Sequence, residues 1–292
     1  MLANPVAGRG RHRRLISDVI ETLRSSGRPC ELLQAGSRAE AAVACNQAVA
    51  DGAAALVALG GDGTLHLALQ AVAGTPVALG VVPLGTGNDF ATAVDISPEP
   101  RIAANAIAGA LRNGRQTRVD LARMIDAEGD SRWFGAVLAT GFDAIVNERA
   151  NRMRWPKGPR RYDLAVALEL ARLRPRAYTL ELDSEVHRFA SVLVAVGNGP
   201  SYGGGMRICP DADLADGLLD IVVADPLSRV TLARLKPRLR RGTHITDPRV
   251  HCYRAREVRI DAEGIVGYAD GERVGPLPLR VGCVPGALRL LR

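Results

Sequence analysis

Two glycine-rich segments carry residues whose types and spacing could do chemistry. The first, "GGDGT" at Gly60–Thr64, follows the apolar run "AALVAL" and leads into a helical pattern. The second, "PLGTGNDFA" at residues 83–91, follows "VALGVVP" in the same way. Glycines let the backbone approach a phosphate closely, and a helix N-terminus offers N–H groups and a partial positive charge. Both segments therefore suit the binding of phosphate.

A third loop, "NPVAGRG" at residues 4–10, follows the short apolar run "LAN". In an open parallel sheet, such loops meet at the carboxyl edge of the strands, so three of them predict a nucleotide-phosphate site. Asp62 is the odd member, because a bare carboxylate repels phosphate; it would suit a metal-bound water or a hydrogen-bonded partner. No G-x-x-x-x-G-K-[ST] is present, and no G-x-G-x-x-G follows the first strand.

Two acidic segments lie in the C-terminal half. In "DGE", an extended strand would place Asp270 and Glu272 on one face, where a carboxylate could accept a hydroxyl proton. The alternative is a "DG" turn beside an exposed glutamate. The second segment, "PDADLADGLLDIVV", lacks the spacing of an EF-hand, and alone it indicates an acidic turn before a strand.

The loops need a sheet edge to hold them, and the hydrophobic pattern predicts one. Apolar runs alternate with helical stretches, with strands expected at "LAN", "CELLQA", "AALVAL" and "VALGVVP" and helices at 15–23, 38–50, 64–73 and 102–111. Continuous apolar strands between such helices indicate a parallel sheet covered on both faces. From residue 117, short strand-like runs predict a mainly antiparallel sandwich or barrel, interrupted by the helical "YDLAVALELARL". We expect domains at 1–116 and 117–284; whether the final segment, 285–292, returns to the first stays open.

The charge suggests an anionic partner. The 292 residues carry a formal charge of +7, and two segments, 149–161 and 229–241, are basic without an acid. Nucleic acid, a membrane surface and a phosphorylated ligand all fit, as does a simply solvated surface. No helix-turn-helix, zinc-finger or RNA-binding signature supports nucleic acid. In 229–241, Pro237 is expected to interrupt an amphipathic helix.

The remaining composition places the chain in the cytoplasm. Its five cysteines are scattered without a C-x-x-C pair, which argues against zinc and disulfides and fits a reducing compartment. No apolar run approaches the ~20 residues that span a bilayer, and the N-terminus becomes polar too early for a signal peptide. Any membrane contact is therefore expected to be peripheral.

In this order and spacing, "NPVAG", "GGDGTL" and "PLGTGNDFA" resemble the diacylglycerol kinase catalytic domain, which bacterial lipid kinases share with sphingosine and ceramide kinases. "YADGERV" and the closing "VPGALRLL" also match, so the resemblance covers essentially the whole chain. The set is specific, whereas "GGDGT" alone also occurs in NAD kinases and phosphofructokinases. The resemblance implies a Rossmann-like three-layer α/β domain of the NAD kinase and phosphofructokinase type, followed by an antiparallel β-sandwich.

The resemblance also implies a nucleotide site for ATP on the first domain. The matching residues are Asn4, Pro5, Val6, Ala7, Gly8, Gly60, Gly61, Asp62, Gly63, Thr64 and Thr86. Two positions depart from the family pattern: Gln34 stands where a nucleotide-binding Thr is usual, and His66-Leu67 replaces Asn-Glu. His66 could donate a hydrogen bond from the first helical turns, and a surface histidine is an equal alternative.

For the chemistry, the resemblance implies Glu272 as proton acceptor, with Asp270 as an orienting group or alternative base. It also implies a structural Mg²⁺ held by the Asp216 carboxylate and by Asp213 and Leu218 through backbone carbonyls. A lipid kinase must reach a hydroxyl at a bilayer surface, where each Lys or Arg contributes roughly 1 kcal/mol on an anionic leaflet. We expect one or both basic segments to face the membrane, with Trp155 suited to the interface.

The sequence thus predicts an ATP- and Mg²⁺-dependent lipid kinase that phosphorylates diacylglycerol or a related lipid alcohol. One alternative is an NAD or other small-molecule kinase that uses the same "GGDGT" loop. Another is a non-catalytic protein that binds a nucleotide or an anionic lipid. The sequence does not select the lipid, and it leaves open whether the chain forms a homodimer.

Overall fold

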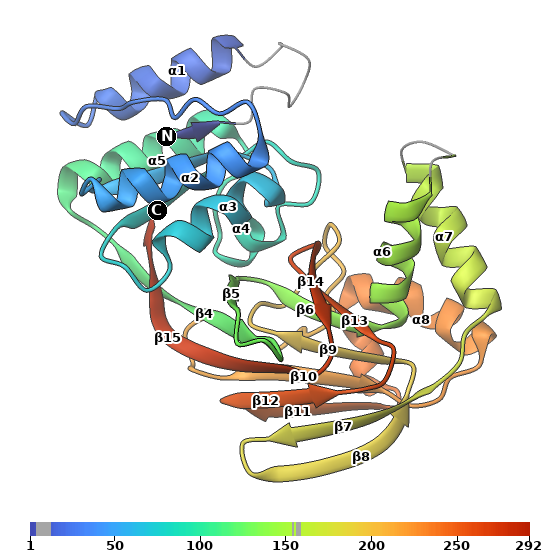
Figure 1. Cartoon of the computed structure of the whole chain (residues 1–292). Helices are drawn as coiled ribbons and strands as arrows, with labels where there is room; N and C mark the ends of the chain where they lie inside the picture. Colours follow the sequence, from blue (N-terminus) through green and yellow to red (C-terminus); the bar gives the residue numbers. More distant parts are fainter. Residues whose placement is uncertain (4–12, 154, 156–158) are drawn as a thin grey trace. The chain divides into compact units, whose positions relative to one another are not determined.

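The computed structural model describes residues 1–3, 13–153, 155 and 159–292. Within them the chain forms two compact units (Figure 1). Unit 1 comprises Met1–Leu121 and Val284–Arg292, and unit 2 comprises Ala122–Cys283. The chain passes from one unit to the other within β4 (Thr117–Ile125) and returns within β15 (Leu279–Leu291).

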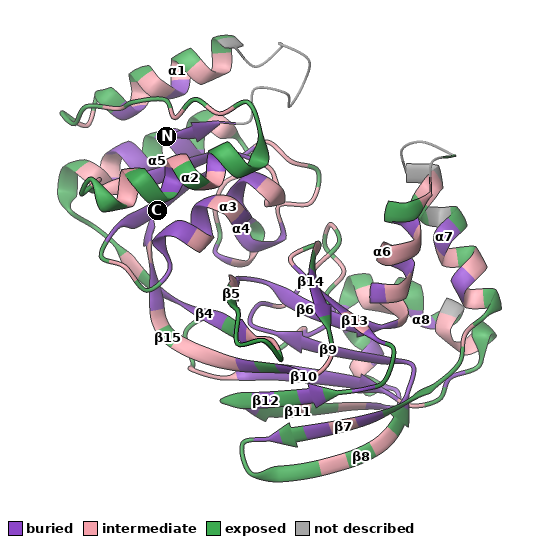
Figure 2. Ribbon diagram, viewed as in Figure 1, coloured by how far each residue is buried: buried purple, intermediate pink, exposed green. Residues whose placement is uncertain are grey.

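Unit 1 is built on a parallel sheet. Its strands are β1 (Leu2–Ala3), β2 (Ala55–Gly60), β3 (Ala78–Pro83) and the end of β15, in that order. Nearly every residue of β2 and β3 is buried, because helices cover both faces of this sheet (Figure 2). The last strand is the chain's own C-terminus, which lies beside β3 through Leu290 and Leu291.

The helices of unit 1 form the outer layers. They are α1 (Arg13–Arg24), α2 (Arg38–Ala50), α3 (Asp62–Val72), α4 (Asp89–Ala93) and α5 (Pro100–Asn113). Val19 and Leu23 of α1 pack with Ile107 of α5 against Val57 and Leu59 of β2. Helices α2 and α3 contact each other and β2. The three-layer α/β architecture predicted for this half is confirmed.

Two local predictions in unit 1 need correction. Helix α3 begins at Asp62, two residues before the expected start, so the "DG" of "GGDGT" already forms its first turn. The strand expected at "CELLQA" is reduced to one parallel bridge between Leu33 and Leu2. The Leu33 N–H donates to the carbonyl of Met1 at 2.8 Å, and β1 is two residues long in the described part of the chain.

Unit 2 contains a six-stranded antiparallel sheet. In order its strands are β11 (Val250–Ala255), β10 (Leu219–Ala224), β9 (Leu193–Gly197), β6 (Val137–Gly141), β13 (Val266–Ala269) and β14 (Glu272–Pro276). Each neighbouring pair is antiparallel. Strand β11 was not predicted, because its exposed Cys252 and Arg254 alternate with few apolar residues.

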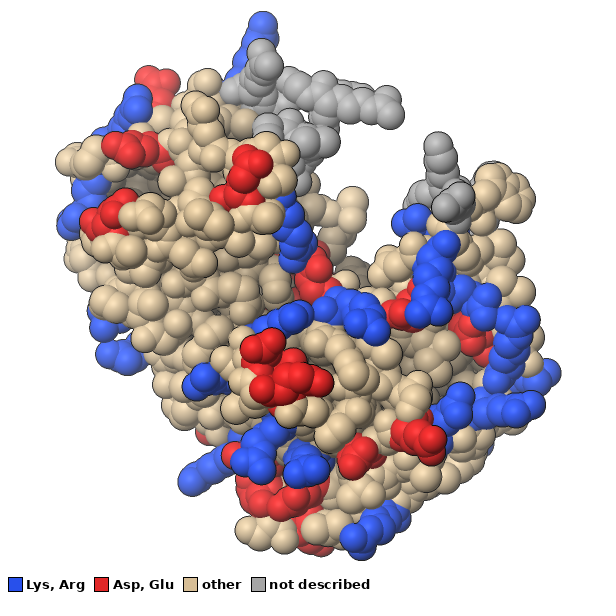
Figure 3. Space-filling view, in the orientation of Figure 1, with Lys and Arg blue, Asp and Glu red and all other residues tan. Residues whose placement is uncertain are grey.

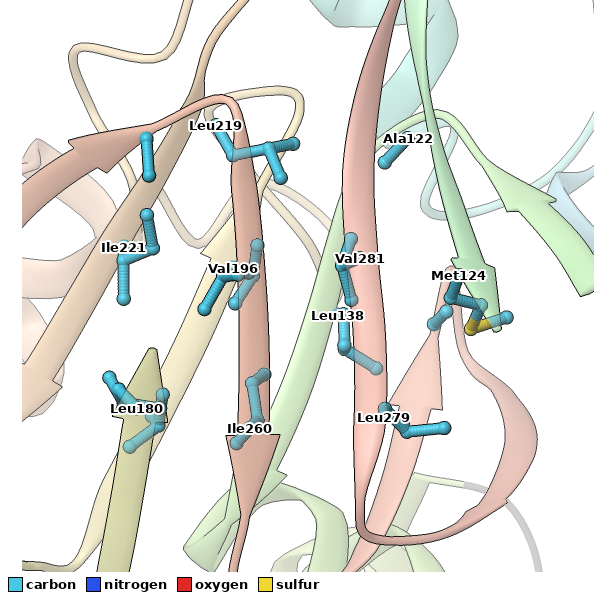
Figure 4. Close-up of a cluster of buried hydrophobic side chains, with 14 of the residues drawn as sticks. Ala122, Met124, Leu138, Leu180, Val196, Leu219, Ile221, Ile260, Leu279 and Val281 are labelled. Carbon is cyan, nitrogen blue, oxygen red and sulfur yellow. The ribbon is translucent and has the colours of Figure 1, made fainter. Parts of the chain in front are cut away.

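A second layer of strands faces this sheet. It consists of the start of β15, β12 (Glu257–Asp261), β7 (Arg176–Leu182) and β8 (Glu185–Ser191), together with β4 and β5 (Ser131–Phe134). Leu138, Val196 and Ile221 from one layer meet Leu180 and Ile260 from the other in one buried cluster (Figure 4). Each such side chain contributes roughly 1.5–3 kcal/mol by its burial. Unit 2 is therefore the predicted β-sandwich.

Helices border the sandwich at three places. They are α6 (Phe142–Arg152), α7 (Pro159–Ala171) and α8 (Arg229–Arg241), the last followed by a 3₁₀ turn, η1 (Thr243–Thr246). Helix α6 was not predicted, because its sequence is polar and shows no clear apolar stripe. The expected interruption at Pro237 is wrong: α8 continues through it, with Leu235 buried and Pro237 on the exposed side.

Candidate active site

The two glycine-rich loops of unit 1 touch each other. The N–H of Leu84 donates to the carbonyl of Gly60 at 2.8 Å, which joins the ends of β2 and β3. A Cβ on Gly85 would lie 2.6 Å from the Cα of Gly61, so the loops can approach this closely only because both residues are glycine. The close packing of glycine backbones fixes the two loops relative to one another.

Hydrogen bonds of Asn88 and Asp62 also hold the two loops together. The Asn88 side chain accepts from the N–H of Gly85 at 3.1 Å and donates to its carbonyl at 2.8 Å. Asp62 accepts the N–H of Asn88 at 3.1 Å. Burial raises the pKa of Asp62, the Asn88 N–H opposes that shift, and the neighbouring Asp89 adds to it. Of the two partners expected for Asp62, a metal-bound water or a hydrogen-bonded group, the structure shows the second.

A cavity of about 440 Å³ opens beside these loops. Two helix starts line it: Gly36, Ser37 and Arg38 at α2, and Gly61 and Gly63 at α3. The first N–H groups of each helix have no partner inside the helix, and each N-terminus carries a partial positive charge. The volume falls within the range of small-ligand pockets. Its lining and its charge suit an anionic phosphate group.

Of the predicted nucleotide residues, the structure brings Gly61, Gly63 and Thr64 together in this cavity. Gly60 lies behind them, where a Cβ would meet the Thr64 hydroxyl at 2.4 Å. Asp62 is engaged with the second loop, and Thr86 is exposed outside the cavity lining. The remaining nucleotide residues, 4–8, lie outside the described part of the chain.

The start of α2 was predicted, but its place in the lining of the cavity was not, although a signal for an ordered helix start was present. "SRAE" is a capping box: Ser37 accepts the N–H of Glu40 at 3.1 Å, and Glu40 accepts the N–H of Gly36 at 2.8 Å. Gln34, the residue aligned with the family's threonine, is exposed and does not line the cavity. His66 is only 7% exposed, so the alternative of a surface histidine is wrong.

The "DGE" segment forms a tight hairpin in unit 2. Asp270 and Gly271 both have positive φ (50° and 81°), and Ala269 pairs with Glu272 across the turn between β13 and β14. The extended strand is therefore wrong and the "DG" turn is correct, although Glu272 is half-buried and not exposed as that alternative expected. Both Asp270 oxygens accept backbone N–H groups, from Gly135 and Ala136, at 2.9 Å each. This carboxylate anchors the hairpin to the β5–β6 connection.

A network from α6 holds the outer side of the hairpin. Glu148 accepts the Tyr268 hydroxyl at 2.7 Å, the Arg273 Nε at 3.2 Å and an Arg152 nitrogen at 2.6 Å. These donors, Tyr268 foremost, lower the pKa of Glu148 and keep it ionised. Glu272, half-buried at the start of β14, thus sits on a hairpin that is fixed from both sides.

In the acidic turn, both predicted carboxylates already have partners. Asp213 accepts the N–H of Ala215 at 3.0 Å, and Asp216 accepts the N–H of Leu218 at 2.9 Å and an ion pair from Arg254. Among the described residues, no group of three or more His, Cys, Asp or Glu side chains could hold a metal ion. The positive charge beside this turn comes from Arg254, which pairs with Asp216 and Asp220.

The two basic segments differ in how many of their cations form ion pairs within the protein. Arg149 pairs with Glu169, and Arg152 pairs with Glu148. Trp155, by contrast, is 78% exposed. On α8, Arg238 pairs with Asp247, whereas the other cations are exposed. In the described residues, no helix is both long enough and apolar enough to cross a membrane.

Unit 1 is a three-layer α/β domain with a cavity between two helix starts, and the family can now be stated. The diacylglycerol kinase catalytic domain matches residues 1–124, and the YegS C-terminal NAD kinase beta sandwich-like domain matches residues 136–292. The chain belongs to the diacylglycerol kinase catalytic-domain family.

Individual relatives agree over the full length. A protein of Mycobacterium tuberculosis named "Diacylglycerol kinase" is 42% identical, covering 100% of this chain and 94% of the relative. A "Probable lipid kinase YegS-like" of Xanthomonas oryzae pv. oryzae is 32% identical over 94% and 90%. Among solved structures, a diacylglycerol kinase from Bacillus anthracis has a TM-score of 0.74 at 19% identity, covering 99% and 94%. An NAD kinase from Archaeoglobus fulgidus in complex with ATP has a TM-score of 0.56 at 13% identity, covering 100% and 92%. These two structures share the fold.

Proposed function

We propose that this protein is an ATP-dependent lipid kinase, which transfers the γ-phosphoryl group of ATP to the hydroxyl of diacylglycerol or a related lipid alcohol. The observation that carries the proposal is the cavity of unit 1, where the starts of α2 and α3 converge on glycines. Membership of the diacylglycerol kinase family supports the same activity.

In this proposal the N–H groups of Gly61 and Gly63 and the Thr64 side chain hold ATP phosphates, with Arg38 adding a guanidinium group at the rim. Phosphoryl transfer needs positioning and electrostatic stabilisation more than covalent chemistry from the protein. Asp62 contributes by holding the second loop in place. The predicted contributions of residues 4–8 and of Thr86 remain part of the proposal.

We assign Glu272 as the acceptor of the proton from the lipid hydroxyl. Asp270 is the orienting residue, because both of its oxygens already accept backbone N–H groups and the hairpin depends on them. Glu148 is a second positioning residue, acting through Tyr268 and Arg273. A general base of this kind contributes roughly 10²–10⁴ in rate.

Mg²⁺ as the companion of ATP belongs to the proposal, as it does for phosphoryl transfer in general. A structural Mg²⁺ at Asp213, Asp216 and Leu218 would require Arg254 to release Asp216. Melting curves in EDTA and in Mg²⁺, for the parent and for Arg254→Ala, test this requirement. Stabilisation by Mg²⁺ in the variant alone would mean that Arg254 takes the place of the ion.

The test of the function is transfer of labelled γ-phosphate to a panel of lipid alcohols in mixed micelles, beside NAD, with Glu272→Ala as control. Label in one lipid that disappears in the control supports the proposal and identifies the substrate. Label in NAD alone favours the small-molecule kinase. Nucleotide binding without transfer to any acceptor favours a non-catalytic binding protein.

Peripheral contact with an anionic membrane surface completes the proposal, on the basis of the exposed cations of α8 such as Arg234 and Lys236. We expect charge reversal of these two residues to reduce sedimentation with anionic vesicles and to leave transfer to a lipid in neutral micelles intact. Unchanged sedimentation would contradict this contact. Assembly into a homodimer is tested in the same preparations by sedimentation velocity.

A further inference from the structure

Unit 2 contains a second cavity, of about 480 Å³, at one corner of the sandwich. Four arginines line it: Arg172, Arg174, Arg176 and Arg229. They come from the end of α7, the start of β7 and the start of α8. Neither Asp270 nor Glu272 contributes to its lining, so it is a separate site from the proposed catalytic residues.

The fold brings these segments together through strand pairing. Arg176 at the start of β7 pairs with Ser191 at the end of β8, and the Ser191 hydroxyl donates to the carbonyl of Ala224 at 2.6 Å. Ala224 ends β10, and five residues later Arg229 begins α8. Arg172 and Arg174 follow the last turn of α7 on the same corner. The convergence is thus set by the strand register and does not depend on flexible side chains alone.

The positive charge of this pocket is not balanced from within. No hydrogen bond or ion pair holds any of the four guanidinium groups in the described part of the chain. The one carboxylate in the lining, Glu169, is buried and paired with Arg149 of α6. In Figure 3, Lys and Arg side chains gather on the surface formed by α6, α7 and α8.

The rest of the lining is apolar. Phe142, Ile145 and Leu173 contribute hydrophobic walls, and Gly141 and Val192 lie buried at the floor. Gly141 has φ 84°, and a Cβ there would meet the Val192 carbonyl at 2.6 Å, so the floor requires glycine. The pocket therefore combines a cationic rim with an apolar interior.

We propose that this pocket binds a phosphate-bearing anion, the chemistry shared by an anionic phospholipid headgroup and a free phosphate ester. Like charges repel, so four arginines around one cavity favour a bound anion over an empty state. The planar guanidinium group matches phosphate oxygens with paired hydrogen bonds, which lysine does not. The apolar walls suit the glycerol and first acyl carbons of a lipid.

The experiment compares two double variants of equal charge in the full-length protein. Arg172→Gln with Arg174→Gln removes two pocket cations, and Arg256→Gln with Arg259→Gln removes two exposed cations at and beside β12. Binding is measured to vesicles of phosphatidylcholine with and without an equal part of phosphatidylglycerol, and by calorimetry to glycerol 3-phosphate. We expect the pocket variant to bind the anionic vesicles about tenfold more weakly, with the control variant close to the parent.

The two arms separate the sources of the anion. Loss of vesicle binding alone assigns the pocket to a lipid headgroup, and loss of glycerol 3-phosphate binding alone assigns it to a soluble phosphate ester. Equal losses in the two double variants, or none in either arm, overturn the proposal, because the charge would then act as a diffuse surface. The double variant Arg172→Lys with Arg174→Lys keeps the charge. Weaker binding by this variant than by the parent would show that the guanidinium geometry contributes to binding.

The proposal is independent of the kinase assignment. Neutral micelles contain no anionic lipid before product forms, so the pocket variant should retain the initial rate of phosphoryl transfer there. If transfer is absent in parent and variant alike while the variant alone loses anion binding, the pocket stands and the proposed function fails. Matched melting temperatures of the three variants confirm that each is folded.

Discussion

Asp62 and Asp270 are two aspartates beside glycines, and they hold their surroundings in different ways. Asp270 lies in the turn itself, and its two oxygens each accept one backbone N–H at 2.9 Å. Asp62 begins a helix, accepts the Asn88 N–H at 3.1 Å, and is buried beside Asp89. The first carboxylate bonds backbone N–H groups with both oxygens, whereas burial raises the pKa of the second.

The difference reflects what each aspartate holds in place. In unit 2, Asp270 joins the hairpin to the β5–β6 connection. In the proposed function, the neighbouring Glu272 accepts the hydroxyl proton. In unit 1 the close approach of Gly61 and Gly85 and the bond from the Leu84 N–H to the Gly60 carbonyl join the two loops. Asp62 adds backbone hydrogen bonds from Asn88 and Asp89. A second strong anchor there would add negative charge next to the phosphates.

The largest effect is expected for Glu272→Gln. If Glu272 accepts the hydroxyl proton, kcat for lipid phosphorylation should fall roughly 10²–10⁴-fold with little change in the KM for ATP. Initial-rate kinetics and a melting curve measure both quantities. Glu263→Gln, at an exposed turn before β13, is the control and should match the parent. A parental kcat in the Glu272→Gln variant would show that Glu272 is not the base.

Asp270→Ala should act on stability first. It leaves the Gly135 and Ala136 N–H groups without their partner, and charged hydrogen bonds of this kind contribute about 1.5–3 kcal/mol each in context. We expect a fall of about 3 kcal/mol in the free energy of unfolding, measured with urea, and a loss of activity from displacement of Glu272. If Asp270→Ala lost activity like Glu272→Gln but kept parental stability, Asp270 would be the base and the distinction between the two aspartates would collapse.

Gly85→Ala tests whether glycine contact holds the loops of unit 1. The added Cβ would lie 2.6 Å from the Gly61 Cα and 2.7 Å from the Asn88 side chain, so the loops must separate. We expect a loss of about 1–3 kcal/mol in stability and a higher KM for ATP. Gly109→Ala, inside α5 with its nearest neighbour at 3.9 Å, should be neutral or stabilising by up to about 1 kcal/mol. Equal effects of the two substitutions would argue against the contact.

Much of this arrangement follows from local sequence. The bounds of α2 agree with the predicted 38–50, and the apolar runs of β2 and β3 mark strands buried on both faces. The phosphate loops were recognisable because glycines, a strand end and a helix start coincide. The division into domains at residue 116 stays a prediction.

The rest depends on contacts between residues far apart in the chain. Asp270 holds N–H groups 134 and 135 residues away, and Glu148 meets Tyr268 at a separation of 120 residues. No periodicity in the sequence encodes such pairs. The "DG" turn itself was one of the two local interpretations, but the sequence did not show that Asp270 would bond Gly135 and Ala136.

The smallest effect, and the sharpest test of the comparison, is the pH dependence of Asp62→Asn. Because the pKa of Asp62 is raised in the folded protein, the folded state binds its proton more tightly than the unfolded state does. Stability then falls as the pH rises above the unfolded value of 3.8, until the folded pKa is passed. The stability of the parent relative to Asp62→Asn should therefore decrease from pH 4 upwards and then level off. Urea unfolding across this range measures the difference in stability, with Asp261→Asn at the exposed end of β12 as control. An increase of the difference with pH would mean that Asp62 is stabilised as an anion, for example by a cation or metal beside the glycine-rich loops.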